Sequence, residues 1–172
     1  MDMIIRKTRE ADLDSIMSII DITRKNFKDE GIPQWQGEYP ARSDIQSDMD
    51  LGQSYVCEMD GVVSGVCAIV CGVEPDYHKI YEGEWKNDRD YVCMHRVALH
   101  PNAKGRGVAA AFVKKAEEIA SSVGVCDLRC DTHEVNKSMR RMLEKNGFEL
   151  CGVIYLSLDG EPRVAYQRCL DK

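Results

Sequence analysis

Apolar residues recur along this chain with two spacings, one typical of helices and one typical of strands. The helical spacing predicts four helices, the first capped by Thr8 and the second by Ser43. These expected helices cover residues 9–30, 43–51, 108–123 and 136–146. The strand spacing predicts strands at residues 4–7, 54–59, 62–71, 91–99, 126–131, 148–158 and 163–170. The alternation of the two kinds of element indicates an α/β (α+β) fold.

Turn-forming dipeptides link two pairs of these strands. Asp60-Gly61 is the pair favoured in a two-residue type I′ hairpin, and Asp159-Gly160 joins the last two strands into a closing hairpin. Two longer segments, residues 32–40 and 72–90, are expected to be loops.

The composition of the chain is that of an ordinary globular protein. Its 172 residues are 44% hydrophobic and 30% charged, which predicts a single domain over residues 1–172. The net charge of -6 argues against sequence-independent binding to nucleic acid, which relies on clustered Lys and Arg. Neither a signal peptide nor a run of about 20 apolar residues is seen, so we expect a cytoplasmic protein with no membrane partner.

Eight cysteines raise the question of disulfides or metal binding. Cys67 and Cys71 lie four residues apart within one expected strand, as do Cys126 and Cys130 within another. Four residues of strand separate Cα atoms by about 13 Å, too far for a disulfide or for one shared zinc ion. We therefore expect reduced, buried, structural cysteines and no metal.

A glycine-rich turn, Lys104-Gly105-Arg106-Gly107-Val108-Ala109, lies between an expected strand and an expected helix. Glycines let backbone N–H groups approach an anion, and a helix N-terminus carries about half a positive charge. A P-loop would need Lys-Ser or Lys-Thr here, and a dinucleotide site would need the turn after the first strand of a βαβ unit. Glycine turns before helices are common, so the turn alone favours a purely structural role over a phosphorylated cofactor.

The order of elements resembles the GNAT family of acyl-CoA-dependent N-acyltransferases. The family signature [QR]-G-x-G-x-[GA] follows a strand, and this chain has Lys104 where Gln or Arg is usual. The resemblance spans nearly the whole chain. It also includes Gln34-Trp35, Tyr39-Pro40, Arg96-Val97-Ala98-Leu99-His100-Pro101, Asp131-Thr132-His133-Glu134-Val135-Asn136, Lys145-Asn146-Gly147-Phe148 and Arg163-Val164-Ala165-Tyr166.

This resemblance implies a mixed sheet of about seven strands with two splayed parallel strands, about four helices, and acetyl-CoA as acyl donor. The first splayed strand would bind the pantetheine arm, and the glycine turn would hold the pyrophosphate. Asn136 matches a cofactor-facing asparagine, with a simple N-cap as the alternative. The implied cofactor-binding residues are Val97, Ala98, Leu99, Lys104, Gly105, Arg106, Gly107, Val108, Ala109 and Asn136.

Acetyl transfer to an amine calls for a base, because a lysine-like amine is protonated at neutral pH. His95 is our first candidate: it precedes Leu99 by four residues on one strand and resembles a histidine of the arylalkylamine acetyltransferase branch. The alternative is a histidine satisfied in the core. His133 and Glu134 are the next candidates.

The leaving thiolate also needs a proton donor. Many GNAT enzymes carry a tyrosine where this chain has Leu143, so Tyr155 or water would have to substitute. Cys93 as an acyl-carrying nucleophile is a further alternative, without an identifiable base.

Family analogy places Trp35, Tyr39 and Tyr81 around the acceptor, together with Tyr77 and Trp85. Aromatic and acidic groups attract a cationic amine, although a charged loop is also typical of a solvated surface. The expected activity is transfer of an acetyl group to a small-molecule or peptide amine. The alternatives are an acyl-CoA-binding module without turnover and an enzyme for longer acyl groups. Exposed edges of the closing hairpin would allow a homodimer.

Overall fold

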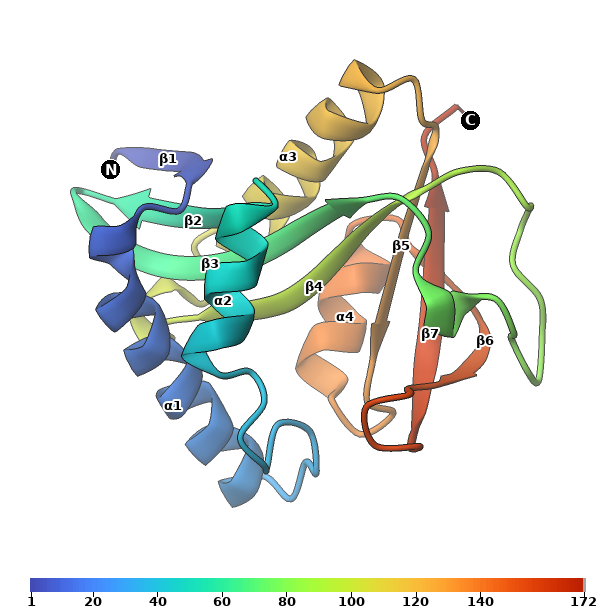
Figure 1. Cartoon of the computed structure of the whole chain (residues 1–172), viewed down its shortest axis with the longest axis horizontal. Coiled ribbons are helices and arrows are strands. Elements are labelled where there is room, and N and C mark those ends of the chain that lie inside the picture. The colour runs from blue at the N-terminus through green and yellow to red at the C-terminus, as the bar shows by residue number, and fades with distance from the viewer. Residues whose placement is uncertain (172) are drawn as a thin grey trace. The chain divides into compact units, whose positions relative to one another are not determined.

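The computed structural model describes residues 1–171, and within them the chain forms four α-helices and seven strands (Figure 1). The helices are α1 (Leu13–Asp29), α2 (Arg42–Asp50), α3 (Val108–Ser122) and α4 (Lys137–Lys145). The strands are β1 (Met3–Lys7), β2 (Ser54–Met59), β3 (Val62–Cys71), β4 (Val92–Leu99), β5 (Asp127–Thr132), β6 (Glu149–Tyr155) and β7 (Pro162–Cys169). Short 3₁₀ turns occupy Glu10–Asp12, Pro75–Tyr77 and Pro101–Ala103.

Hydrogen bonds join the strands into one mixed sheet in the order β1-β2-β3-β4-β5-β7-β6. The strands β4 and β5 are parallel, with Val92–Met94 opposite Leu128–Cys130. Antiparallel pairing joins β1 to β2, β2 to β3, β5 to β7 and β6 to β7. The predicted fold class, a mixed seven-stranded sheet with two central parallel strands and four helices, is confirmed.

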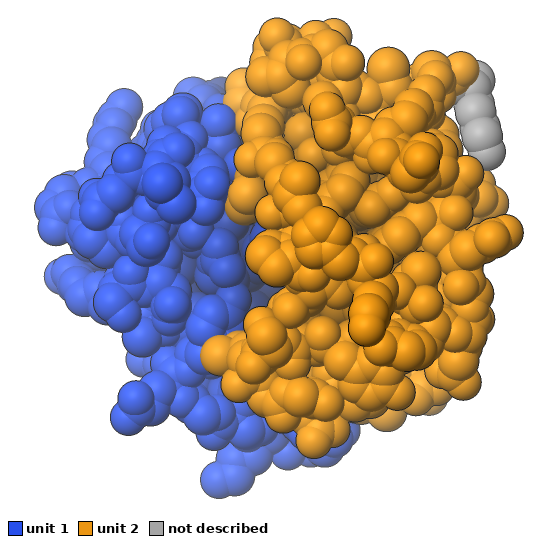
Figure 2. Space-filling view, turned by 45° about the vertical axis from the view of Figure 1, so that its right-hand side comes forward, with its two compact units in different colours: residues 1–69, 95–112 blue, residues 70–94, 113–172 orange. Residues whose placement is uncertain are grey.

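The chain divides into two compact units, coloured separately in Figure 2. The first unit contains Met1–Ile69 and His95–Phe112, and the second contains Val70–Met94 and the chain from Val113 onward. The prediction of a single domain stays a prediction. Each unit has its own hydrophobic core.

In the first unit, α1 and α2 pack against strand residues (Figure 1). The apolar face of α1 predicted from sequence is buried, and Ile16 and Ile20 have no exposed surface. The core of this unit consists of Leu13, Ile16, Ile19, Ile20, Ile45, Val56, Val66 and Ala98. At Gly65 of β3 an added Cβ would lie 2.8 Å from Leu99 Cδ2, so only glycine permits this close approach.

In the second unit, most of residues 72–90 are exposed, as expected of a loop, but Tyr77 lies in the core and Trp85 packs against it. Tyr77 is only 2% exposed, and its carbonyl oxygen accepts a hydrogen bond from Trp85 Nε1 at 2.9 Å. The guanidinium of Arg129 lies 4.1 Å from the ring centroid of Trp85 and equally close to that of Tyr91. This stacking places a buried cation between two aromatic faces, where the ring quadrupoles stabilise it.

The two predicted helix caps are wrong. Thr8 forms a hydroxyl contact of 2.7 Å with Ser54, and α1 begins only after the turn at Glu10–Asp12. Ser43 lies inside α2, where the Asp44 carboxylate accepts a 2.6 Å hydrogen bond from the Ala41 N–H. For Thr8 the competing contact is remote in sequence, whereas for Ser43 a local contact three residues apart places the start of α2 earlier.

The eight cysteines are free thiols, as expected. Cys67 and Cys130 are buried, but their strand partners in sequence, Cys71 and Cys126, are exposed. The expectation of burial is therefore correct for only one member of each pair, because Cys71 ends β3 and Cys126 precedes β5.

Candidate functional site

The glycine turn opens α3 with two residues in the left-handed region. Gly105 has φ 73° and Gly107 has φ 84°, conformations that a residue with a Cβ rarely adopts. No heavy atom lies within 4 Å of a Cβ built at either position, so both glycines border open space. The carbonyl of Gly107 accepts the N–H of Ala111, which starts the helix immediately after the turn.

Backbone hydrogen bonds hold the turn in place. The N–H groups of Lys104 and Arg106 donate to the carbonyls of Pro101 and Ala103 at 3.2 and 3.3 Å. The side chains of Lys104 and Arg106 are exposed, and the N–H groups of the first helical turn have no partner within the helix. Positive charge, open space and helix N–H groups therefore coincide at the position predicted to bind pyrophosphate.

The remaining donor-site residues of the first unit lie on either side of this turn. Val97 and Leu99 of β4 are half-buried, whereas Ala98 is 2% exposed and packs in the core. In α3, Val108 is buried and Ala109 is half-buried. The strand β4, the turn and the start of α3 are thus consecutive in this unit.

Arg96 interrupts the regular extension of β4. Its φ is 52°, in the left-handed region, and its guanidinium forms a two-point ion pair with Asp48 of α2. The inference that His95 and Leu99 share one face assumed uninterrupted alternation, which does not hold across Arg96. His95 itself is half-buried, and its Nε2 atom is covered.

The first predicted acceptor loop, residues 32–40, is held by one arginine of α1. Arg24 donates from Nε to the Trp35 carbonyl at 2.9 Å and from Nη2 to the Pro40 carbonyl at 3.1 Å. The ring of Trp35 lies 5.6 Å from that of Phe27, and the Tyr39 hydroxyl contacts Arg96. Trp35 and Tyr39 therefore belong to one ordered loop.

In the second unit, Asn136 is the N-cap of α4. Its Oδ1 accepts a hydrogen bond from the Met139 N–H at 3.2 Å, and the residue is 5% exposed. The N-cap alternative is thereby confirmed, while the cofactor role stays a prediction. Leu143 of the same helix is fully buried.

Two predicted base candidates follow β5. His133 Nδ1 accepts the Val135 N–H at 3.3 Å, which in the neutral ring leaves the proton on Nε2. Burial, and secondarily the charge of Arg163, lowers the pKa of His133 and favours its neutral form. Glu134 is exposed, and its carbonyl accepts a hydrogen bond from Arg140.

The last predicted acceptor residue, Tyr81, borders β6. It exchanges two backbone hydrogen bonds of 2.8 Å with Val153, and its ring lies edge-on to Tyr155 at 5.2 Å. Both tyrosines are about half exposed. Tyr77 is different: it is buried and donates to Asp131 at 2.6 Å, so it serves the core.

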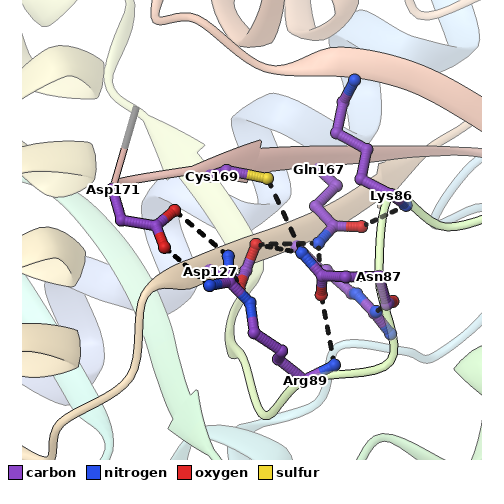
Figure 3. A network of polar contacts seen from close by, with 8 residues as sticks. Lys86, Asn87, Arg89, Asp127, Gln167, Cys169 and Asp171 are labelled. Atoms are coloured by element: carbon purple, nitrogen blue, oxygen red, sulfur yellow. Dashed lines mark hydrogen bonds and ion pairs between the residues drawn. The ribbon is translucent and has the colours of Figure 1, made fainter.

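Sequence reasoning missed two polar clusters. One is the group of Asp48, Arg96 and Tyr39; the polar pair His95-Arg96 inside an apolar strand was its only local signal. The other, shown in Figure 3, centres on Asp127, whose side chain has no exposed surface. Its other labelled members are Lys86, Asn87, Arg89, Gln167, Cys169 and Asp171.

Residues 1–171 contain neither a membrane-spanning helix nor a metal-ligand cluster. None of the helices is both long and apolar enough to cross a membrane. In the same residues, no three His, Cys, Asp or Glu side chains are grouped as metal ligands would be.

Comparison with known proteins identifies the class to which this fold and turn belong. The profile of the Acetyltransferase (GNAT) family matches residues 16–148. The chain therefore belongs to the GNAT family of acetyltransferases, and the predicted family is confirmed. No curated protein matches it.

Solved structures support this assignment. A GNAT-family acetyltransferase from Streptococcus agalactiae is 37% identical, with a TM-score of 0.88 over 99% of this chain and 96% of that one. Two further structures share the fold. The yncA protein from Salmonella typhimurium, solved with its cofactor acetyl-CoA, is 18% identical over 99% of this chain and 95% of that one, with a TM-score of 0.67. A ribosomal-protein-alanine N-acetyltransferase from Brucella melitensis is 20% identical over 97% and 99%, with a TM-score of 0.69.

Proposed function

We propose that this GNAT acetyltransferase moves an acetyl group from acetyl-CoA to a primary amine by direct transfer in a ternary complex. The observation that carries the proposal is the turn at residues 104–107, with two left-handed glycines, open space above them and a helix N-terminus behind. The similar fold of yncA, which was solved with acetyl-CoA, supports the choice of donor.

The donor site that we propose is built from residues of β4 and the glycine turn. The backbone of Val97 to Leu99 would bind the pantetheine arm, and residues 104–109 would hold the pyrophosphate. A Cβ at Gly105 or Gly107 would project into the open space, which fits a close backbone approach to an anion. Asn136 is a further proposed donor contact. When bound, acetyl-CoA supplies an activated thioester carbonyl.

The protein must lower the cost of deprotonating the acceptor amine. An amine with a pKa of about 10.4 costs roughly 4–5 kcal/mol to deprotonate at neutral pH. We propose His95 as the base or as the end of a water chain to it. His133 is the second candidate, because its lowered pKa keeps the ring neutral and able to accept a proton. Glu134 is the third.

The proposed reaction also needs groups that stabilise the oxyanion and protonate the thiolate. Backbone N–H groups of β4 near Leu99 are candidates for the oxyanion. Leu143 offers no proton and is fully buried, so the acid would be Tyr155 or a water molecule. An acyl-cysteine route through Cys93 is disfavoured, because burial raises the pKa of this thiol well above its usual value.

We propose Trp35 and Tyr39 in the first unit, and separately Tyr81 in the second, as candidates for contact with the acceptor. These aromatic rings are suited to a cationic amine through cation-π contact. Homodimerisation by strand pairing at β6 is constrained, because Tyr81 and Glu84 already bond to the backbone of Val153 and Cys151. A dimer would therefore use another surface. We propose a cytoplasmic location from the sequence.

The function is tested by incubating the protein with acetyl-CoA and libraries of small amines and peptides, with products detected by mass spectrometry. Calorimetry with coenzyme A runs in parallel. An acetylated amine supports the proposal. Coenzyme A binding without any product would instead support an acyl-CoA-binding module, and a product only with longer acyl-CoA would redefine the donor. No binding would refute all three.

Substitution of His95 by glutamine should lower the rate most near neutral pH and least at high pH, where the amine is already neutral. The physical reason is that a general base contributes only while its substrate holds a proton. The pH profile of kcat/KM measures this directly. His133→Gln is the comparison: if it alone gives the pH-dependent loss, the base is His133 and not His95.

A further inference from the structure

Arg96 has an unusual backbone conformation within β4, next to the residues that we propose bind the donor. It is a residue with a Cβ at φ 52°, directly between His95 and Val97. Residues with side chains avoid this region unless their surroundings hold them there, and such conformations concentrate at functional sites. This left-handed conformation turns the peptide groups on either side of Arg96 away from the regular pattern of the strand.

Contacts of its side chain hold Arg96 in this conformation. Its Nε and Nη2 atoms each donate to a different oxygen of Asp48, both at 2.6 Å. The two side chains are only 16% and 6% exposed, and Gln53 donates a further hydrogen bond to Asp48 at 3.1 Å. A two-point pair fixes the plane of the guanidinium as well as its position.

The same guanidinium reaches the predicted acceptor loop. Arg96 Nη1 donates to the Tyr39 hydroxyl at 2.9 Å. That loop is held at its other points by Arg24, through the carbonyls of Trp35 and Pro40. The side chain of Arg96 therefore links β4 to both α2 and the loop of residues 32–40.

Resting on the proposed function, we propose that Arg96 is a positioning residue. It holds the left-handed backbone of β4 next to His95 and fixes Tyr39 against that strand. Arg96 acts through its neighbours and not on reacting atoms. Its role is geometric: the strand that presents backbone to the donor and the loop that meets the acceptor share one anchor.

Stabilisation alone is a weaker explanation of this cluster. Replacing a buried ion pair by apolar residues of similar volume is often neutral or stabilising, so such pairs are weak evidence for a role in stability. Arg6 and Asp12, in the same unit, form a pair of nearly equal burial, with side chains 17% and 8% exposed. This second pair is also bonded at two points and provides a control of similar burial.

The test compares Asp48→Asn with Asp12→Asn. Each removes one buried carboxylate charge from a two-point arginine pair, but Arg6 keeps a second ion pair with Glu58 at 2.7 Å, so we expect the smaller loss of thermal stability in Asp12→Asn. Only Asp48→Asn should lower kcat, on the order of a hundredfold, because small displacements of reacting groups have effects of this size. Hydrogen exchange of the amides of residues 95–99 should be faster in Asp48→Asn than in Asp12→Asn.

Tyr39→Phe isolates the contact with the loop. It removes one hydroxyl and keeps the ring, so we expect a higher KM for the acceptor amine with an unchanged KM for acetyl-CoA. Equal kcat and equal amide exchange in Asp48→Asn and Asp12→Asn would overturn the proposal. If the wild-type protein acetylates no amine, the proposed function fails, and amide exchange alone still decides whether Arg96 holds the strand.

Discussion

Replacement of Gly107 by valine is expected to reduce coenzyme A binding below detection while the protein stays folded. A valine Cβ would enter the open space above the turn, where we place the pyrophosphate. No protein atom lies within 4 Å of that Cβ, so the fold itself is not blocked. The residual cost is the left-handed backbone, about 1–2 kcal/mol. Calorimetric titration with coenzyme A measures the affinity.

Gly124→Val is the matched control for this prediction. Gly124 follows the C-terminal end of α3, has φ 72°, and likewise has no atom within 4 Å of an added Cβ. It should lose similar stability in thermal unfolding and keep its affinity for coenzyme A. Unchanged affinity in Gly107→Val would refute the assignment of the turn to the pyrophosphate.

The second large effect is expected at Asp127, at the start of β5. Asp127→Ala should lower the free energy of unfolding by about 2–4 kcal/mol, because buried donors that lose their acceptor cost about 1–3 kcal/mol each. Asn87 and Gln167 donate to its Oδ1 at 3.0 and 2.9 Å, and Arg89 pairs with its Oδ2 at 2.8 Å (Figure 3). Urea unfolding at neutral pH measures the loss.

The same carboxylate predicts a dependence on pH. Burial alone would raise the pKa of Asp127, but hydrogen bonds from Asn87, Cys169, Gln167 and Arg89 outweigh it and lower the pKa. A carboxylate with a lowered pKa stabilises the fold above its unfolded pKa, about 4, and this contribution disappears as the pH falls through the folded value. The difference between wild type and Asp127→Ala should therefore shrink in acid below about pH 4.

Asp171→Asn separates the buried carboxylate from its exposed neighbour. Asp171 pairs with Arg89 at 2.6 Å, but the side chains are 45% and 44% exposed. Exposed ion pairs contribute about 0–1 kcal/mol, so this variant should stay close to wild type. A loss as large as that of Asp127→Ala would show that Arg89, and not burial of Asp127, determines the stability of this cluster.

Elements whose formation depends on neighbouring residues were predictable. The Asp60-Gly61 turn has φ 49° and 83°, the positive values that a type I′ hairpin requires, and Met59 pairs with Val62 as expected. Asp159-Gly160 likewise lies between β6 and β7, which pair antiparallel as the predicted closing hairpin requires. Hydrophobic spacing likewise located α1, because the face that it buries repeats with the period of the helix itself.

Features that depend on distant residues were not predictable. Residues 72–90 form the expected, mostly exposed loop, but the burial of Tyr77 within it was not expected; its hydroxyl donates to Asp131, which lies 54 positions away. Thr8 does not cap α1, and its hydroxyl instead contacts that of Ser54. In each case a partner remote in sequence outweighed a local preference.

By itself, the sequence determined the family, the order of elements and the glycine turn, because each depends on short patterns of residue type and spacing. Only the tertiary structure decided that Arg96 has a left-handed backbone conformation within β4 and that Asp48 and Tyr39 contact its guanidinium. It also decided that Asp127 is buried among hydrogen-bond donors. The reason is physical. A left-handed arginine inside a strand is unfavourable on its own, and only partners brought together by folding make it stable.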